Sequence, residues 1–495
     1  MTAIASGHDT RRAADELLSW VPTGCLVGGE WRDASSGSVI DVLDPATEEI
    51  VATVADGTVD DALAAVDAAA HALAEWRSTS PRHRSEVLRA AYGIMTDRAE
   101  ELARLMTLEN GKALGDARGE VAYAAEFFRW FSEEAVRNAG ELMTAPSGAN
   151  RILVTRQPMG VALLITPWNF PAAMLTRKIG PALAAGCTVV CKPASETPLT
   201  ALAVGRVLEE AGVPPGVVNI VPSRRSGDVA RAVLSDARVR KLSFTGSTEV
   251  GRTLLGLAAE NVVSCSMELG GNAPFVVFAD ADLDAAIDGA MVAKMRNGGE
   301  ACTAANRFYV EASVAAEFAE RLAQRMGALR MGPGLDEGVE LGPLVNASSR
   351  DKVRDLVFEA RDVGAVAVVG GDAPGGTGYF FPATVLADVP AGASLLRAEI
   401  FGPVAPVVSF STEAEAISLA NDTEYGLASY VYTADLARGL RVAEAIETGM
   451  VGLNRGLVSD PAAPFGGVKQ SGLGREGGHE GMLEYSEQKY IACNW

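Results

Sequence analysis

The spacing of hydrophobic positions changes along the chain. Between residues 59 and 143 apolar residues recur every three or four positions, as in VDDALAAVDAAAHALAEW, which predicts amphipathic helices. From residue 161 onward, short and nearly continuous apolar runs alternate with helical segments. Such runs are typical of parallel strands that are covered on both faces of a sheet. The pattern therefore predicts an α/β protein.

The first alternating series predicts a doubly wound, nucleotide-binding type of domain. Helical segments separate its strands, beginning with AAMLTRKIGPALAAG after the first strand. The predicted strands are VALLITP, CTVVCKP, VVNIVP, VRKLSF and VVSCSMEL.

A second α/β series begins after GGNAP, near residue 273. Its predicted strands are FVVF, NRFYV, VAPVVSF, ASYVYT and MVGLN. The β-like runs RILVTRQP and KYIACNW fit neither series, and we expect them to pair with another part of the structure or with another subunit. The chain therefore divides into residues 1–145 with 163–272, residues 273–477, and the segments 146–162 and 478–495.

Composition narrows the classes of function. A chain of 495 residues is long enough for two or three domains. Its net charge of −20 argues against nucleic-acid binding, which needs a basic face. The N-terminus lacks an apolar core of signal-peptide length, and no run approaches the roughly 20 apolar residues of a membrane span. We therefore expect a cytoplasmic protein that does not enter a membrane.

Cysteine and histidine usage argues against disulfides and metal centres. Six cysteines do not make a disulfide framework in a chain of this length. None of the four histidines lies between residues 84 and 478, so no local histidine–cysteine cluster can form there. We expect no metal site. The histidines are His8, His71, His83 and His479.

Polar and small residues follow four of the predicted strands. Ligands of an open α/β sheet bind at the carboxyl ends of its strands, so these residues are candidates for a binding site. The fingerprint G-x-G-x-x-G is absent, although Ser247 and nearby backbone amides at a helix start suit a phosphate. The strand-end segments are Thr166-Pro167-Trp168-Asn169-Phe170, Lys192-Pro193-Ala194-Ser195, Phe244-Thr245-Gly246-Ser247 and Glu268-Leu269.

Taken singly, each candidate also has an ordinary structural interpretation. Cys302, in NGGEACTAANRF, is the kind of isolated cysteine that is usually an inert core residue. Glu268 ends an apolar strand, where a carboxylate is costly unless it is paired with an arginine or has a function. Asn169 precedes Phe-Pro and suits the capping of a turn.

Seven motifs favour a catalytic interpretation of these residues over the structural one, because together they resemble the aldehyde dehydrogenase superfamily. They run in family order from residue 166 to 476, and the similarity covers nearly the whole chain. The motifs are TPWNFP, KPAS, FTGSTEVG, MELGGNAP, NGGEACTAANR, EIFGPV and PFGGVKQSGLGREG.

The resemblance implies a fold of two doubly wound α/β domains with a small β oligomerisation element. Residues 1–145 and 163–272 would form the cofactor-binding domain, and residues 273–477 the catalytic domain. Residues 146–162 and 478–495 would form the oligomerisation element of a homodimer or homotetramer.

The resemblance also assigns catalytic roles. Cys302 would be the nucleophile, and its thiolate would attack an aldehyde to give a thiohemiacetal and then a thioester. The Asn169 amide and the Cys302 backbone N–H would form the oxyanion hole, and Glu268 would be the general base for hydrolysis. Glu399 and Phe401 would position the nicotinamide ribose and ring. Beside these matching motifs, the interpretation of Cys302 as inert core is disfavoured.

The implied cofactor is a nicotinamide dinucleotide. Ser195 stands where many NAD-preferring relatives have a glutamate, and a serine beside Lys192 accepts a 2′-phosphate that a carboxylate would repel. We therefore expect NADP, with NAD as an alternative. The loop that contains Arg224 and Arg225 departs from the family pattern and leaves open whether either arginine reaches the phosphate. The implied cofactor-binding residues are Thr166, Pro167, Trp168, Asn169, Lys192, Pro193, Ala194, Ser195, Gly227, Phe244, Gly246, Ser247, Leu269, Glu399 and Phe401.

Within the superfamily, the chain most resembles the succinate-semialdehyde dehydrogenase branch. MLTRKIGPALAAGC, ENGKALGDARGEVAYAAEFFRWF and NRGLVS carry this resemblance. It implies that Arg177, Arg296 and Ser459 bind the carboxylate of a semialdehyde and hold its carbonyl over Cys302. Both arginines would instead be structural if they pair with internal acids. Phe170 and Phe465 complete the expected substrate-binding set.

Some alternatives stay open at this stage. Arg455 occupies a variable position, so glutarate semialdehyde or a broader range of aldehydes remains an alternative substrate. Ala304 stands where some relatives have a second cysteine, so no redox disulfide switch is expected. The presence of Glu268 favours hydrolysis over acyl transfer to coenzyme A or phosphate. The presence of both Cys302 and Glu268 argues against a non-catalytic nucleotide-binding protein, and the missing histidine partner argues against a cofactor-free cysteine hydrolase.

Overall fold

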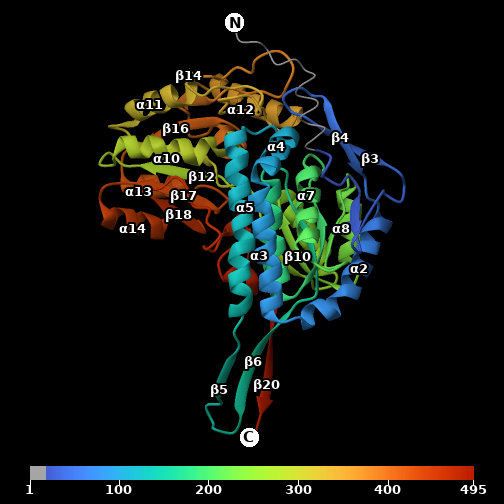
Figure 1. Cartoon of the computed structure of the whole chain (residues 1–495). Coiled ribbons are helices and arrows are strands. Elements are labelled where there is room, and N and C mark those ends of the chain that lie inside the picture. The colour runs from blue at the N-terminus through green and yellow to red at the C-terminus, as the bar shows by residue number, and fades with distance from the viewer. Residues whose placement is uncertain (1–17, 495) are drawn as a thin grey trace.

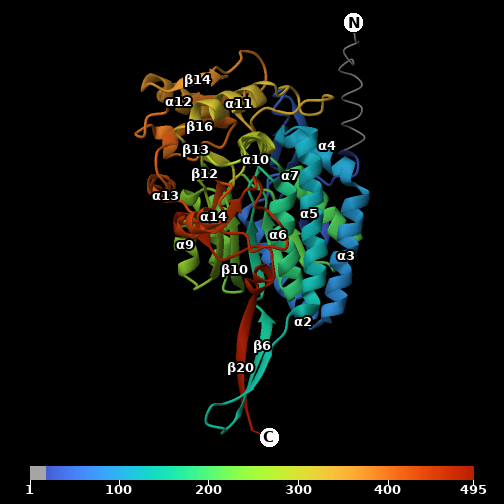
Figure 2. The ribbon, with the colours of Figure 1, turned by 90° about the vertical axis from the view of Figure 1, so that its left-hand side faces the viewer.

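Two large sheets and a narrow arm make up the structure, a computed structural model that describes residues 18–494 (Figures 1 and 2). Residues 1–17, which include His8, and residue 495 lie outside the described part. No described helix is both long enough and apolar enough to cross a membrane. The cytoplasmic location stays a prediction.

The first sheet has eight strands, and its five central strands are parallel. These five are the strands that the apolar runs predict. The antiparallel edge strands β1, β2 and β19 are additions that the sequence pattern did not indicate. In spatial order the strands are β19 (Gly472–Leu473), β11 (Ser264–Glu268), β10 (Val239–Thr245), β7 (Val161–Ile165), β8 (Thr188–Lys192), β9 (Val218–Ile220), β1 (Cys25–Val27) and β2 (Glu30–Arg32).

Helices cover both faces of this sheet, as its fully buried central strands require. One face packs on α2, α8 and α9, and the other packs on a layer that includes α3, α5, α6 and α7 (Figure 1). Local signals start several helices, such as the capping box between Thr58 and Asp61 at α2. The helices are α2 (Val59–Ser78), α3 (Pro81–Asp97), α4 (Ala99–Asn110), α5 (Leu114–Glu134), α6 (Pro171–Ala185), α7 (Pro198–Glu210), α8 (Ser226–Leu234) and α9 (Thr248–Ala259).

The second sheet has seven strands, of which five match the predicted runs and are parallel. Strand β15 adds to them in parallel, and β14 forms an antiparallel edge. The strands are, in spatial order, β14 (Val366–Val369), β15 (Thr384–Ala387), β16 (Val404–Phe410), β13 (Ala305–Glu311), β12 (Ala273–Val277), β17 (Ala428–Tyr432) and β18 (Met450–Leu453). The helices of this part are α10 (Leu283–Met295), α11 (Ala315–Gly327), α12 (Ala347–Asp362), α13 (Glu413–Asn421) and α14 (Leu436–Ala445).

The arm is a separate three-stranded antiparallel sheet, and it projects away from both large sheets (Figure 1). Strand β6 (Arg151–Pro158) pairs along its whole length with β20 (Ser486–Cys493), so the two β-like runs pair with each other. Strand β5 (Glu141–Thr144) forms the other edge, and it begins within the region for which the sequence predicted helices. The short α15 (Glu480–Leu483) precedes β20. Strands β3 (Val39–Leu43) and β4 (Ile50–Ala55) form a two-stranded sheet of their own, separate from the other three sheets.

Candidate active site

Cys302 lies in a tight loop between α10 and β13, where the backbone folds back on itself. The loop begins with the residues Asn297, Gly298 and Gly299, all of which have positive φ. A side chain on Gly299 would come within 2.3 Å of the Gly402 carbonyl oxygen, so the loop packs directly on the EIFGPV segment. Cys302 is partly exposed to a cavity, yet the surrounding protein buries its sulfur enough to raise the pKa of the thiol to about 12. The resting sulfur is therefore a thiol, and it needs a base to react.

Asn169 comes next to this loop from the carboxyl end of β7. Its side-chain nitrogen donates a hydrogen bond to the Glu300 carbonyl oxygen at 3.0 Å. An amide group carries two N–H bonds, so the second remains for another acceptor. In the part of the chain that the structure describes, no acceptor takes the backbone N–H of Cys302 either. Two donors are thus available near the sulfur, as an oxyanion hole requires.

Glu268 ends β11 and is buried, with neither carboxyl oxygen in a hydrogen bond. Burial, aided by the nearby Glu476 carboxylate, raises its pKa well above the ordinary value. Although burial opposes the ionisation of Glu476 as well, Arg177 and Lys178 hold the pKa of that group below its usual range. Both cations lie 2.5 Å from Glu476 oxygens. Glu268 is therefore the one of these two carboxyl groups that holds its proton more tightly, which makes it the stronger base when it is ionised.

Glu399 and Phe401 lie beside the same loop. The Gly271 N–H donates to Glu399 Oε1 at 3.0 Å, and the Phe401 ring meets the Trp168 ring edge-on at a centroid distance of 5.3 Å. A side chain on Gly271 would come within 2.3 Å of the Cys302 carbonyl oxygen. The ELGG segment thus brings Glu268, Glu399 and Cys302 together because its second glycine lets two backbones touch.

A cavity of about 220 Å³ joins these residues. The structure therefore places the predicted nucleophile, amide donor and base around one space, with Glu399 and Phe401 beside them. Met174, Thr245, Gly270, Ser349 and Lys352 also line it, and the last two could not be predicted because α12 carries no recognised motif. The predicted residues in the lining are Pro167, Trp168, Asn169, Gly246, Ser247, Glu268, Leu269, Cys302, Glu399 and Phe401.

The second predicted cofactor segment follows β8. Lys192 is 6% exposed, and no described residue accepts a hydrogen bond from its Nζ. Burial lowers its pKa to about 8, although Glu196 and Asp56 favour the charged form. An unpaired buried cation next to Ser195 fits a ligand that brings a phosphate. The charge of Arg224 is already paired, because Asp56 accepts hydrogen bonds from its Nε at 3.2 Å and from its backbone N–H at 2.9 Å.

The remaining predicted cofactor residues surround these segments. The Thr166 N–H donates to the Lys192 carbonyl oxygen at 3.2 Å, and so joins the ends of β7 and β8. The ring of Phe244 packs against Gly246, and Gly227 is exposed in the first turn of α8. Pro193 and Ala194 lie between Lys192 and Ser195 in the turn after β8.

The two predicted substrate arginines differ in their surroundings. Arg177 is buried and paired with Glu476, and its guanidinium lies 4.3 Å from the centre of the Phe465 ring. Arg296 lies 5.0 Å from the centre of the Phe170 ring and has no carboxylate within ion-pair distance among the described residues. The interpretation that both arginines pair with internal acids therefore holds for Arg177 and not for Arg296. Ser459 is half-buried.

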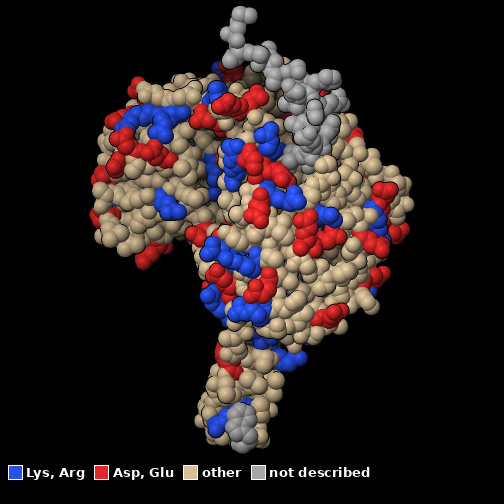
Figure 3. Space-filling model, in the orientation of Figure 1, with Lys and Arg blue, Asp and Glu red and all other residues tan. Residues whose placement is uncertain are grey.

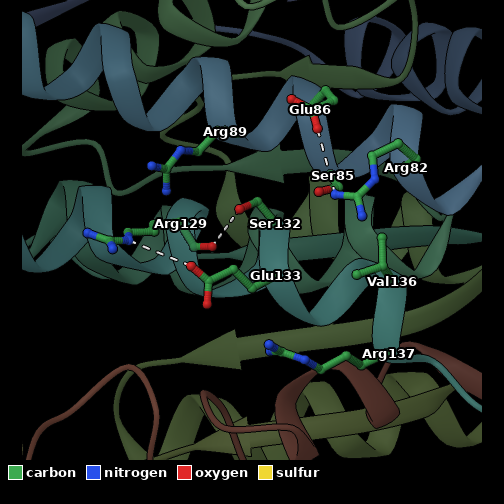
Figure 4. A pocket seen from close by; sticks show the side chains of 9 residues that line it. All are labelled: Arg82, Ser85, Glu86, Arg89, Arg129, Ser132, Glu133, Val136 and Arg137. Carbon is green, nitrogen blue, oxygen red and sulfur yellow. Dashed lines mark hydrogen bonds and ion pairs between the residues drawn. The ribbon is translucent and has the colours of Figure 1, made fainter.

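A larger hollow of about 520 Å³ lies elsewhere, between α3 and α5 (Figure 4). It contains none of the residues above. Three of its four arginines already have acidic partners, as in the pairs Arg82–Glu86 and Arg129–Glu133, each at 3.7 Å. We therefore place the chemistry in the smaller cavity.

Comparison with known proteins agrees with this geometry. Residues 31–491 match the Aldehyde dehydrogenase family, and the chain belongs to that family. It is 58% identical to a succinate-semialdehyde dehydrogenase of Paenarthrobacter nicotinovorans, over 89% of this chain and 98% of the relative. It is 50% identical to an Escherichia coli succinate-semialdehyde dehydrogenase [NADP(+)], over 94% and 96%. A glutarate-semialdehyde dehydrogenase of Pseudomonas putida is 49% identical, over 94% and 97%.

A solved structure shows the same fold. The crystal structure of an E. coli NADP-dependent enzyme superposes with a TM-score of 0.95 at 49% identity, covering 96% of this chain and 99% of that one. The expected aldehyde dehydrogenase-like α/β fold is thus confirmed.

Proposed function

We propose that this enzyme oxidises succinate semialdehyde to succinate with NADP. The observation that supports this most directly is Arg296, an unpaired cation six residues before Cys302 whose charge lowers the pKa of the thiol against the effect of burial. A carboxylate at the far end of a short aldehyde would pair with it and bring the carbonyl group to Cys302. The named relatives support the same substrate and cofactor.

The proposed reaction begins at Cys302. Its sulfur attacks the aldehyde carbon, the thiol proton passes to Glu268, and the carbonyl electron pair moves onto oxygen beside the Asn169 amide and the Cys302 N–H. NADP, when bound, accepts the hydride that leaves this carbon. Glu268, after losing its proton to solvent, deprotonates a water that attacks the thioester, and the Cys302 thiolate leaves. One aldehyde, one NADP⁺ and one water thus give one carboxylate, one NADPH and two protons.

The residues around Lys192 support NADP over NAD. A 2′-phosphate would supply a directly bound anion for the buried Lys192, and the Ser195 hydroxyl, which donates to Glu196 Oε2 at 3.2 Å, would turn from Glu196 to the phosphate. The Thr245 hydroxyl, which is buried without a partner in the cavity wall, offers a further polar contact to a ligand.

Glutarate semialdehyde is the second candidate substrate. It differs by one methylene group, and a relative named for it is nearly as similar to this chain as the E. coli enzyme is. One methylene group in a pocket changes kcat/KM by about 10- to 200-fold, so the two substrates are separable by rate.

The function is tested by initial rates of NADPH formation with succinate semialdehyde, glutarate semialdehyde and butanal. Succinate semialdehyde should exceed butanal by at least about 100-fold in kcat/KM, because butanal lacks the carboxylate. Arg296→Gln should remove most of this advantage and slow butanal oxidation much less, because the lost charge also raises the pKa of the Cys302 thiol. Equal rates for the two aldehydes would show a general aldehyde dehydrogenase, and no rate with NADP or NAD would refute the substrate.

We also propose an assignment of parts. Residues 1–145 and 163–272 would bind the cofactor, residues 273–477 would supply Cys302, and the arm segments 146–162 and 478–495 would join subunits into a dimer or tetramer. Two features support the role of the arm, namely its exposed apolar side chains and the outer edges of β5 and β20, which no other described strand pairs with.

A further inference from the structure

A buried ion pair that lies outside the seven motifs around the cavity is attached to the loop that carries Asn169. Lys112 Nζ lies 2.6 Å from Glu120 Oε2, and it also donates to the Asn169 carbonyl oxygen at 2.6 Å. Both charged side chains are almost completely buried, at 1% and 0% exposure. They come from the turn after α4 and from α5, which belong to neither parallel series.

The other carboxylate oxygen of Glu120 is also fully used. It accepts the backbone N–H groups of Ala172 at 2.9 Å and Ala173 at 3.2 Å, which begin α6. A carboxylate at this end of a helix is favoured by the unpaired N–H groups and the helix dipole. The pair therefore holds the carbonyl of Asn169 and the first turn of the helix that follows it.

Neighbouring contacts fix the same short segment from other sides. Asn110 donates to the Trp168 carbonyl oxygen at 3.1 Å, and Asn297 donates to the Asn169 carbonyl oxygen at 2.9 Å. Lys112 Nζ also lies 4.5 Å from the centre of the Phe170 ring. The backbone of residues 168–170 is thus bound at successive positions, and little freedom is left for the direction of the Asn169 side chain.

The cost of this arrangement argues for a function. A buried ion pair is often no more stabilising than apolar residues of the same volume, so stability alone does not explain it. What this pair provides is a fixed backbone position for one side chain. With its first N–H on the Glu300 carbonyl oxygen, the Asn169 amide can direct its second N–H only if its backbone stays in place.

We propose that the Lys112–Glu120 pair positions Asn169 for stabilising the oxyanion that forms when Cys302 attacks a carbonyl group. Neither Lys112 nor Glu120 lines the cavity, so the pair would act through Asn169. The inference rests on the proposed role of Asn169, but not on the identity of the aldehyde or the cofactor.

The test compares two reactions of Cys302 that need no cofactor. Acylation by p-nitrophenyl acetate passes through an oxyanion and releases nitrophenolate in a burst, whereas alkylation by iodoacetamide displaces iodide and forms no oxyanion. Lys112→Met should slow the acylation burst by about 10- to 100-fold, because a displaced donor loses much of its effect. Alkylation should change by less than about twofold.

A double-mutant cycle makes the test specific. Asn169→Ala should slow acylation by about 100-fold, and adding Lys112→Met should slow it no further, because the positioned group is already absent. Glu120→Gln, which keeps an acceptor for α6 but removes the charge, should give a smaller loss that also vanishes in the Asn169→Ala background. It keeps the inference testable should Lys112→Met not fold.

A matched control is Lys241→Met. Lys241 is also fully buried and paired, with Glu484 at 3.1 Å, but it contacts no part of residues 168–173. Its loss should lower thermal stability and leave acylation within about twofold. The inference would be overturned by additive losses in the cycle, by equal losses of acylation and alkylation, by no loss in Lys112→Met, or by an equal loss in Lys241→Met. If Asn169→Ala itself leaves acylation unchanged, both the oxyanion hole and this inference fail, whatever aldehyde the enzyme oxidises.

Discussion

At the scale of single residues, the reactivity of the site comes from burial that neighbouring charges only partly offset. Burial raises the pKa of both Cys302 and Glu268 and so favours their protonated forms. The charge of Arg177 lowers both pKa values and partly opposes this effect. A thiol and a carboxyl group with a raised pKa thus face one cavity as a nucleophile and a base. Neither residue would be reactive in the same way if it were exposed to water.

The raised pKa of Cys302 makes its reactivity depend on pH. Because that pKa is about 12, the thiolate fraction at lower pH is small and grows about tenfold for each added pH unit. Iodoacetamide should therefore alkylate Cys302 in the cofactor-free enzyme about 100-fold faster at pH 9 than at pH 7. Mass spectrometry of the Cys302 peptide measures this rate, with Cys302→Ser as the blank. A rate that levels off below pH 9 would contradict the prediction.

The sequence indicated the reacting residues but not what surrounds them. Cys302, Glu268 and Asn169 each follow a strand or stand in a recognisable motif, so strand-end reasoning gathers them at one edge of the fold. The contacts of Lys112 and Glu476 could not be foreseen. They join positions tens to hundreds of residues apart, and no local pattern encodes such pairs.

At the scale of elements, apolar runs predicted the long buried strands well. Apolar residues predominate in most of the parallel strands of both sheets, and such buried runs have few other stable arrangements. The missed strands β1, β2 and β19 have only two or three residues, which is too short for any periodicity. Packing against an existing sheet edge, and not local propensity, makes them strands.

The contact between the ELGG segment and the Cys302 loop is an element-scale constraint. Gly271→Ala would place a methyl group about where the Cys302 carbonyl oxygen lies, so one of the two segments must move. We expect a loss of about 1–3 kcal/mol in the free energy of unfolding and at least a tenfold loss of kcat.

Thermal unfolding and aldehyde oxidation rates measure both effects. The control is Gly256→Ala on α9, where an added methyl group meets nothing within 4 Å and should stabilise the helix slightly. Full activity in Gly271→Ala would show that the Cys302 loop tolerates displacement.

At the scale of the whole molecule, the arm stands out from the rest of the surface. It projects beyond the two helix-covered sheets, and most of its visible surface is uncharged (Figure 3). Leu142 and Tyr490 are each about three-fifths exposed, and Met143 and Ile491 are also exposed. Apolar side chains on a narrow projection are unfavourable in water, and contact with another subunit would cover them.

This arrangement predicts that changes in the arm alter the assembly. Leu142→Lys combined with Ile491→Lys should convert the proposed dimer or tetramer to smaller species, because lysines at a covered apolar contact carry a desolvation cost. Light scattering coupled to size-exclusion chromatography measures the mass. Val363→Lys, at a similarly exposed valine on the second sheet's helical cover, serves as the control and should leave the mass unchanged. A monomeric wild-type protein would refute the proposed role of the arm.

The pairing of β19 with β11 also bears on how the protein is made. The strand that ends in Glu268 gains its outer neighbour only when Gly472 and Leu473 have been synthesised, and the arm is complete only with β20. A chain emerging from the ribosome thus carries the first sheet with an open edge at β11 while residues 269–473 are being synthesised. An open sheet edge can pair with strands of other chains. Nascent chains of this enzyme should therefore depend on chaperones until β20 has been synthesised and released.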